Sequence, residues 1–407
     1  MKKVELLAPA GDFEKLKIAV EYGADAVYFG GEMFSLRSGA GNMTIDEIKE
    51  GIKYAHEKGV RCHMAMNVYA HNEDIEPLRN YLQQIKELDI DAFIVSDPAV
   101  ITIIREIIPD AEFHLSTQAN MTNYVTAKFW HDIGIKRLVL ARELTLDEIR
   151  EIRAKTPDTL DIESFVHGAM CISYSGRCLL SNFMTGRDAN RGECAHPCRY
   201  KYRLEEEKRP GEYWPVDEDN RGTYIFNSKD LCMLEHIPEL IDTGIMSFKI
   251  EGRMKSIFYI AHVVGAYRKA IDAYYEDPNN YSYNPEWFTE MCKASHREFT
   301  TGFYFRKPTN EDQNYLTSAY TRDYSFTGIV KNYDPETGMA IVEQRNRMFI
   351  GDEIEVFGPG TDYFRQKLEV MLDEDGNPVD SAPHPQQILQ IKMDRPVDVN
   401  FMLRKEK

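Results

Sequence analysis

Apolar and polar residues alternate on two length scales through the first 277 residues of the chain. Short apolar runs, bounded by Gly, Asp or Pro, are separated by longer stretches with a helical period. Runs of this kind are typical of strands buried in a parallel sheet. Eight of them occur, at residues 4–10, 26–31, 61–67, 92–97, 112–118, 137–143, 161–168 and 247–252.

Amphipathic helices are predicted between these strands. In residues 44–59 the apolar side chains share one helical face, and Thr44 with Glu47 forms a capping-box sequence. Residues 144–156 repeat the device with Thr145. Further helical stretches are 75–89, 123–134 and 256–277. Alternating strands and helices indicate an α/β fold, a (β/α)8 TIM-like barrel, with a doubly wound open sheet as the alternative.

The barrel is expected to span residues 1–277, followed by two further segments. Residues 278–321 are polar and turn-rich, which predicts a linker with a short helix. Residues 322–407 hold six short alternating runs, which predict a small C-terminal all-β barrel. About 78 residues separate the seventh strand from the eighth, far more than a usual loop. We expect this insertion to include a helix at 231–244.

The overall charge limits the possible partners. The chain of 407 residues has a net charge of −17, which opposes non-specific binding to nucleic acid. A local group of cations nevertheless occurs within and just after a cysteine-rich stretch, at Arg187, Arg191, Arg199, Lys201 and Arg203. These cations could form a basic mouth for RNA, or they could only balance the charge of a nearby metal centre.

The chain contains no run of eighteen apolar residues, so no transmembrane helix is expected. The opening MKKVELLAPAGD has a five-residue apolar stretch, which predicts a buried strand rather than a signal peptide. We therefore expect a cytoplasmic protein with no membrane partner.

Four of the seven cysteines lie in one Gly-, Ser- and Arg-rich loop: Cys171, Cys178, Cys194 and Cys198. A loop can bring four thiols to one point, so we expect a metal centre. The odd total and the scattered remaining cysteines argue against disulfides. Zinc remains an alternative, although only Cys194 and Cys198 have the close spacing of a zinc hook. Four unrelated thiols are a further alternative, and an iron–sulfur cluster suits the pattern best.

The same stretch carries a longer motif. It contains Glu163-x-Phe165-x-x-Gly168-Ala169-Met170-Cys171, followed by Gly176-x-Cys178-x-Leu180-Ser181. This pattern resembles the signature of the collagenase-like proteins of peptidase family U32. The resemblance extends from LLAPAGD near the start to the β-rich C-terminal segment.

The resemblance implies a specific chemistry. Family members carry an oxygen-sensitive 4Fe-4S cluster and hydroxylate their substrates without molecular oxygen. The branch that this sequence most resembles uses prephenate as the hydroxyl donor and makes 5-hydroxyuridine at the tRNA wobble position. Relatives act on ribosomal RNA or on ubiquinone precursors. The historical family name leaves a peptidase as the alternative, with His167 or His196 beside a cysteine, because the chain contains neither HExxH nor GxSxG.

Polar residues near the predicted strand ends are candidates for the site, because barrel active sites lie at the carboxyl ends of the strands. They are Asn67, Asp97, His114, Gln118, Glu143, Glu163, His167, Lys249, Glu251 and Arg253. Each could instead be a hydrogen-bonded core group. Lys249, Glu251 and Arg253 alternate, so they should face one side if the strand continues.

Roles are assigned to these candidates as follows. Glu163 and His167 are the candidates for catalytic proton transfer. Arg37, Arg177, Lys249, Glu251 and Arg253 are the candidates for substrate binding, and their cations would hold the dicarboxylate prephenate. The expected partners are a tRNA anticodon loop, prephenate, and a homodimeric or paralogous partner subunit.

Overall fold

The computed structural model describes residues 3–35, 42–171, 173–174, 178–200, 203–205, 211, 213–215, 229–308 and 320–407. Eight parallel strands form a closed barrel. They are β1 (Glu5–Pro9), β2 (Ala26–Phe29), β3 (Arg61–Met66), β4 (Ala92–Val95), β5 (Phe113–Leu115), β6 (Arg137–Val139), β7 (Asp161–Ala169) and β11 (Ser247–Ile250). Each pairs with the next, and β11 pairs with both β7 and β1. This double pairing closes the sheet, so the TIM-like barrel is confirmed and the open sheet is excluded.

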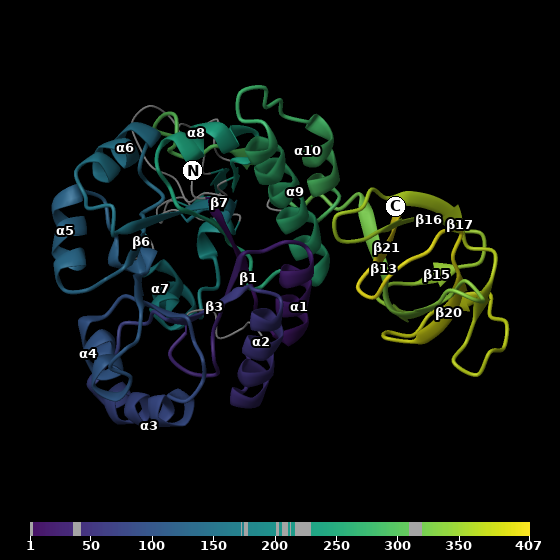
Figure 1. Cartoon of the computed structure of the whole chain (residues 1–407), viewed down its shortest axis with the longest axis horizontal. Coiled ribbons are helices and arrows are strands. Elements are labelled where there is room, and N and C mark those ends of the chain that lie inside the picture. Colours follow the sequence, from purple (N-terminus) through teal and green to yellow (C-terminus); the bar gives the residue numbers. More distant parts are fainter. Residues whose placement is uncertain are drawn as a thin grey trace.

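Helices surround the barrel as a ring in Figure 1. They are α1 (Phe13–Glu21), α2 (Ile45–Glu57), α3 (Ile75–Ile85), α4 (Pro98–Ile107), α5 (Tyr124–Asp132), α6 (Leu146–Ala154), α8 (Ile237–Asp242) and α9 (Ile257–Glu276). Both predicted capping boxes are present, at Thr44 with Glu47 and at Thr145 with Glu148. The reciprocal hydrogen bonds satisfy backbone N–H groups that the first helical turn leaves unpaired.

The insertion between β7 and β11 contains α7 (Leu180–Thr185), the short hairpin of β8 (Arg203–Glu205) and β9 (Tyr213–Pro215), and β10 (Asp230–Cys232). The helix predicted at 231–244 is wrong in its first part. Residues of β10 pair antiparallel with the carboxyl end of β7 and parallel with β12 (Phe299–Thr300). The long strand β7 offers unpaired backbone groups there, and sheet pairing overrides the helical pattern.

The C-terminal segment forms a separate all-β domain with its own apolar core. Its strands are β13 (Tyr324–Asp334), β14 (Met339–Gln344), β15 (Met348–Phe349), β16 (Glu353–Phe357), β17 (Phe364–Lys367), β18 (Met371–Leu372), β19 (Ser381–Ala382), β20 (Ile388–Lys392) and β21 (Met402–Glu406). Seven of these make one antiparallel sheet in the order β17-β16-β21-β13-β14-β20-β18, which curves into a half-barrel. The strands β17 and β18 form the two edges of this sheet.

The C-terminal domain contacts the barrel domain beside α9 and α10 (Pro285–Cys292) (Figure 1). The fully buried Arg404 lies at this contact. Its guanidinium donates to Glu355 at 2.8 Å, to Glu290 at 2.6 Å and to Nε2 of His262 at 2.5 Å. Burial, followed by the charge of Arg404, holds the pKa of His262 well below its usual range, so the ring is neutral and accepts this bond.

Among the residues that the structure describes, no helix is long and apolar enough to cross a membrane.

The contact between the domains makes a prediction about Arg404. Replacing Arg404 by Met keeps the aliphatic stem but removes one of the two buried cations that Glu290 and Glu355 share; the other is Lys293, which lies 2.5 Å from Glu290 and 2.9 Å from Glu355. We expect the free energy of unfolding in urea to fall by about 3 kcal/mol, since breaking a buried ion pair leaves an uncompensated charge. The control is Arg365→Met, because Arg365 also binds Glu355, at 2.9 Å, but its side chain is 66% exposed. This change should cost about 0–1 kcal/mol. Equal losses of unfolding free energy in the two variants would contradict the special role of the buried Arg404.

Candidate functional site

A pocket opens at the carboxyl ends of the barrel strands. Its lining comes from the segments that follow β3, β5, β6, β7 and β11, together with the cysteine loop. Its empty volume, including the open mouth, is about 1170 Å³. Its position, at the carboxyl ends of the strands, is where active sites of such barrels lie.

The floor of the pocket is apolar except for one amine. Tyr28, Ala65, Ile94 and Phe165 line it, and Lys249 rises between them. The Lys249 amine lies 4.4 Å from the ring centre of Tyr28 and is 2.7 Å from Glu163. This cation is therefore held by a carboxylate and by aromatic faces rather than by water.

A charged layer lies beneath this floor, inside the barrel. Glu163 is fully buried between Lys249 and Arg137, whose guanidinium donates to it at 3.2 Å. Arg137 also binds Glu5, which accepts a 2.8 Å hydrogen bond from Ser247. Burial raises the pKa of Glu5, but the neighbouring cations outweigh this effect and hold it well below its usual range.

The position of Glu163 corrects its expected role. Its carboxylate lies under the floor and is not part of the pocket lining. It is committed to two buried cations, so it positions Lys249 instead of exchanging protons with a substrate. His114, expected at the rim, is likewise enclosed inside the barrel beside His63, with ring centres 4.7 Å apart. Burial lowers the pKa of His114 well below its usual range and keeps it neutral.

His167 also lies elsewhere than predicted. The register of β7 against β11 shifts by one residue, because Lys249 pairs with Phe165 whereas Ile250 pairs with His167. This bulge turns His167 out of the barrel, where it contacts the rings of Tyr259 and Tyr267 on α9. Burial lowers its pKa to about 3. The prediction that His167 acts in the pocket is therefore corrected.

Lys249, Glu251 and Arg253 all line the pocket. Strand β11 ends at Ile250, so strand alternation does not explain this common orientation. Instead, the chain after Ile250 crosses the end of the barrel so closely that two neighbouring positions have no space for a Cβ atom. A Cβ on Gly168, whose φ is +112°, would come within 2.6 Å of the carbonyl oxygen of Glu251. A Cβ on Gly30 would come within 2.5 Å of the Arg253 guanidinium.

Arg253 is 4% exposed, and its Nη1 donates to Ser35 at 2.8 Å. The guanidinium is thus fixed at the pocket wall by a short hydrogen bond.

Arg142, a pocket residue that the sequence did not single out, donates to Glu251 at 3.4 Å and to the carbonyl of Ala169 at 2.8 Å. Its neighbour Glu143 was named instead, because β6 ends at Val139 and strand alternation gives no guidance beyond that point.

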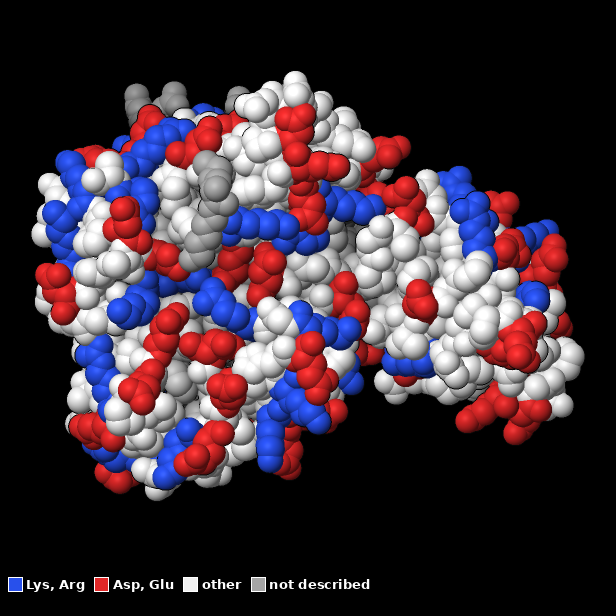
Figure 2. Space-filling model, in the orientation of Figure 1, with Lys and Arg blue, Asp and Glu red and all other residues white. Residues whose placement is uncertain are grey.

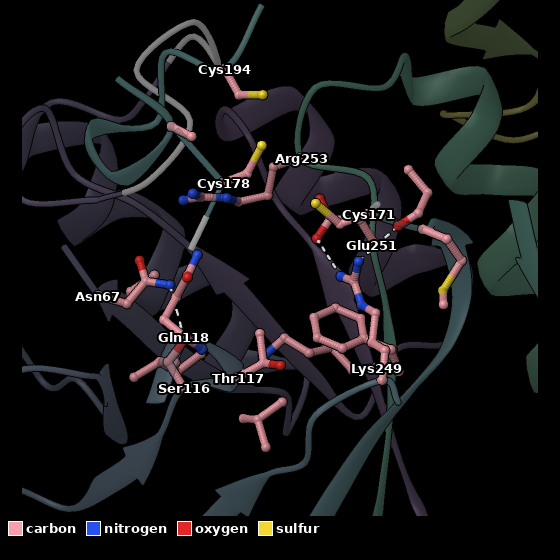
Figure 3. A pocket seen from close by; sticks show the side chains of 18 of the residues that line it. Asn67, Ser116, Thr117, Gln118, Cys171, Cys178, Cys194, Lys249, Glu251 and Arg253 are labelled. Atoms are coloured by element: carbon pink, nitrogen blue, oxygen red, sulfur yellow. Dashed lines mark hydrogen bonds and ion pairs between the residues drawn. The ribbon is translucent and has the colours of Figure 1, made fainter. Parts of the chain in front are cut away.

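A polar wall faces these charged residues across the pocket. It consists of Asn67, Ser116, Thr117 and Gln118, and Asn67 donates to Ser116 at 3.1 Å (Figure 3). Asp97 and Glu143 are absent from the described lining. Asp97 instead caps α4 by accepting from the backbone N–H of Ala99 at 2.8 Å, so its role is structural.

The four loop cysteines Cys171, Cys178, Cys194 and Cys198 all line the pocket. The sulfur atoms of the first three lie on the side of the pocket away from Ser116 and Thr117 (Figure 3). The backbone N–H of His196 donates to the sulfur of Cys194 at 3.4 Å. Residue His196 adopts a left-handed conformation, with φ of 55°, in the turn between the last two cysteines.

The described residues include one tight group of potential metal-ligand atoms outside the pocket. Among the described residues, the metal-ligand atoms that all lie within 4.8 Å of one another belong to His56, Cys62 and Asp91, and not to the loop cysteines.

Several predicted residues cannot be placed. Arg37, Arg177 and Lys201 lie outside the described residues, as do the side chains of Arg199 and Arg203. Of the remaining predicted cations, Arg187 is exposed just after α7, and Arg191 pairs with Glu73 and Asp74 at 3.4 Å.

The fold and this site define a barrel enzyme of a known family. The model of peptidase family U32 matches residues 11–314, and that of the family's C-terminal domain matches residues 322–404. The chain belongs to peptidase family U32.

Individual relatives carry two kinds of name. The tRNA hydroxylation protein P1 of Bacillus subtilis is 46% identical over 406 residues, which cover 100% of this chain and 96% of the relative. The tRNA hydroxylation protein P of Escherichia coli is 35% identical over 448 residues and covers 99% of this chain and 96% of its own. A protein of Porphyromonas gingivalis named collagenase is 33% identical over 376 residues, covering 90% and 89%.

Proposed function

We propose that this protein is an RNA hydroxylase that converts the wobble uridine of tRNA to 5-hydroxyuridine without molecular oxygen. Prephenate is the hydroxyl donor, and a 4Fe-4S cluster is bound by Cys171, Cys178, Cys194 and Cys198. One observation carries the proposal: a single pocket joins four thiols to buried cations. The chain is also similar over its whole length to proteins named for tRNA hydroxylation.

The donor set supports the cluster. Four thiolates on one loop suit iron–sulfur chemistry, and the N–H of His196 stabilises negative charge on Cys194. Bound there, a cluster would supply electron-transfer or Lewis-acid chemistry beside the pocket.

The cationic wall supports an anionic co-substrate. Arg253 is buried and held by Ser35, so its planar guanidinium is pre-oriented for a carboxylate. Lys249 contributes a second positive charge at the floor, partly balanced by Glu163. Two cations at fixed positions can hold the two carboxylates of prephenate in one orientation. Because these side chains are already ordered before binding, less conformational entropy is lost when the ligand binds.

Surface charge and exposed apolar side chains support binding of unstacked bases. Basic and acidic side chains are interspersed on the face seen in Figure 2, which does not favour a duplex held mainly through its phosphates. Within the insertion that carries the pocket cysteines, Leu179 and Phe183 are 76% and 89% exposed. They are four residues apart, so they share one face at α7. An exposed aromatic ring such as that of Phe183 can stack on the bases of a single-stranded loop.

The peptidase alternative is less well supported. A cysteine protease requires an imidazole within hydrogen-bond reach of its thiol. Of the two candidate histidines, His167 faces α9, outside the barrel.

The activity is tested with protein purified without oxygen and with the cluster intact. Incubation with prephenate and unmodified tRNA should produce 5-hydroxyuridine at the wobble position, detected by nucleoside mass spectrometry, and omission of prephenate should abolish it. Ribosomal RNA and gelatin are assayed in parallel. Hydroxylation of ribosomal RNA alone would redirect the proposal to that substrate, and gelatin cleavage without hydroxylation would overturn it.

The cluster is tested by iron and sulfide analysis of the same anaerobic protein. We expect about four irons and four sulfides per chain, with a visible absorption that bleaches on reduction. Serine replacement of Cys178 or Cys194 should remove most of the iron because a ligand is lost. The matched control is Cys292→Ser on α10, which should leave the iron content unchanged. Retention of iron in the Cys194→Ser protein would contradict the assigned ligand set.

The role of the α7 surface is tested by replacing Phe183 with Ala. Loss of one base stack should weaken binding of an anticodon stem-loop by about 5- to 100-fold, measured by fluorescence anisotropy. Phe183→Trp should retain binding. Phe129→Ala on α5 is the matched control, because Phe129 is 59% exposed but belongs to a helix on the outside of the barrel. Equal affinities for all three variants would exclude stacking at α7.

A further inference from the structure

Gln118 presents an unused hydrogen-bonding group to the pocket. It lies in the single turn η2 (Thr117–Ala119) after β5 and is 8% exposed. Its side-chain oxygen is buried and has no hydrogen-bond partner. In Figure 3 the carboxamide points into the pocket beside Asn67. A buried carbonyl without a donor costs about 1–3 kcal/mol, so a ligand that supplies a donor would recover this free energy.

The backbone around Gln118 is firmly held. Its N–H donates to the hydroxyl of Ser116 at 3.3 Å. Its carbonyl accepts from the hydroxyl of Tyr69 at 2.5 Å and from the side chain of Asn120 at 2.7 Å. Asn120 closes the turn in a left-handed conformation, with φ of 54°. These contacts fix the direction in which the side chain leaves the main chain, which is what a recognition residue requires.

The pocket separates two kinds of ligand chemistry. Arg253 and Lys249 offer donors and positive charge, and they match the carboxylates of an anionic co-substrate. The oxygen of Gln118 is a buried acceptor without a partner, and the same carboxamide carries N–H donors beside it. It therefore calls for a neutral ligand with an N–H group, placed against the polar wall.

We infer that Gln118 binds the Watson–Crick edge of the reacting uracil and determines specificity for this base. The inference rests on the proposed function. The side-chain oxygen accepts from N3–H of uracil, and the side-chain amide donates to the adjacent carbonyl. Cytosine places a lone pair at N3 and is disfavoured. A base must leave its stack to reach such a pocket.

This orientation also accounts for the position of the reaction. C5 and C6 lie on the edge of the pyrimidine ring opposite N3. With N3–H against Gln118, C5 points away from the polar wall. It then faces the side of the pocket that carries the cations and the cysteines.

The inference is tested by a double-mutant cycle on binding, which needs no turnover. Anticodon stem-loops carry either uridine or 3-methyluridine at the wobble position, and the methyl group removes the N3–H donor. Both are titrated against the cluster-loaded wild-type protein and the Gln118→Met variant. Wild type should bind the methylated loop about 5- to 100-fold more weakly, and Gln118→Met should bind the two loops nearly equally. A merely structural role for Gln118 would lower both affinities and leave their ratio unchanged.

Further variants and assays separate the possible failures. Gln118→Glu keeps the acceptor for N3–H but loses the amide donor and gains a charge beside the uracil carbonyl, so both loops should bind more weakly while the preference for uridine is retained. Gln83→Glu makes the same chemical change on the exposed surface of α3 and should behave as wild type. An unchanged ratio in Gln118→Met overturns the inference, whether or not the protein hydroxylates tRNA. A collapsed ratio without hydroxylation supports the base contact and contradicts the proposed reaction. If neither loop binds the wild-type protein, the inference fails together with the RNA assignment.

Discussion

The ion pair between Lys249 and Glu163 joins the two strands that complete the barrel. Lys249 belongs to β11 and Glu163 to β7, and their side chains meet at 2.7 Å inside the closed sheet. A buried charge is tolerated when it is paired and hydrogen-bonded, and here Arg137, Glu5 and Ser247 extend the pairing across the interior. Many barrels of this class fill this layer with branched apolar side chains. In this chain the charged layer supports a single amine in the pocket floor, so closure of the fold and construction of the site use the same contact.

The pocket above this layer has three chemically different walls. The cations come from β11 and the segment after it, the amides follow β3 and β5, and the cysteines belong to the insertion after β7. These segments are far apart in the sequence and meet because parallel strands bring all their carboxyl ends to one face. Acceptors of an anionic co-substrate and the N–H of a base would thus find different partners in one cavity. This separation places the cations and the amides on different walls of one cavity.

The C-terminal domain is fastened to the barrel by a buried polar hub instead of a purely apolar seam. Arg404 reaches from β21 to Glu290 and His262, which belong to α10 and α9. Because a buried guanidinium is stable only with all its partners in place, the hub favours one orientation of the two domains. The stacked rings of Phe258 and Phe326, 5.1 Å apart, add apolar contact to the same junction. Any RNA contact made by this domain would therefore have a defined position relative to the pocket.

The sequence by itself determined the local features of this protein. Periodicity identified the eight barrel strands, and Thr44 and Thr145 marked helix starts, because strand alternation and capping depend on neighbours within a few residues. The four loop cysteines, Asn67, Gln118, Lys249, Glu251 and Arg253 were also recognised as pocket candidates from the positions of strand ends. Tertiary structure decided the rest. A one-residue bulge turned His167 away from the pocket, and a buried ion-pair network placed Glu163 beneath the pocket floor. Sheet pairing made residues 231 and 232, predicted as helix, part of a strand. Each outcome depends on contacts between segments distant in the chain, and such contacts leave no periodic signal in the sequence.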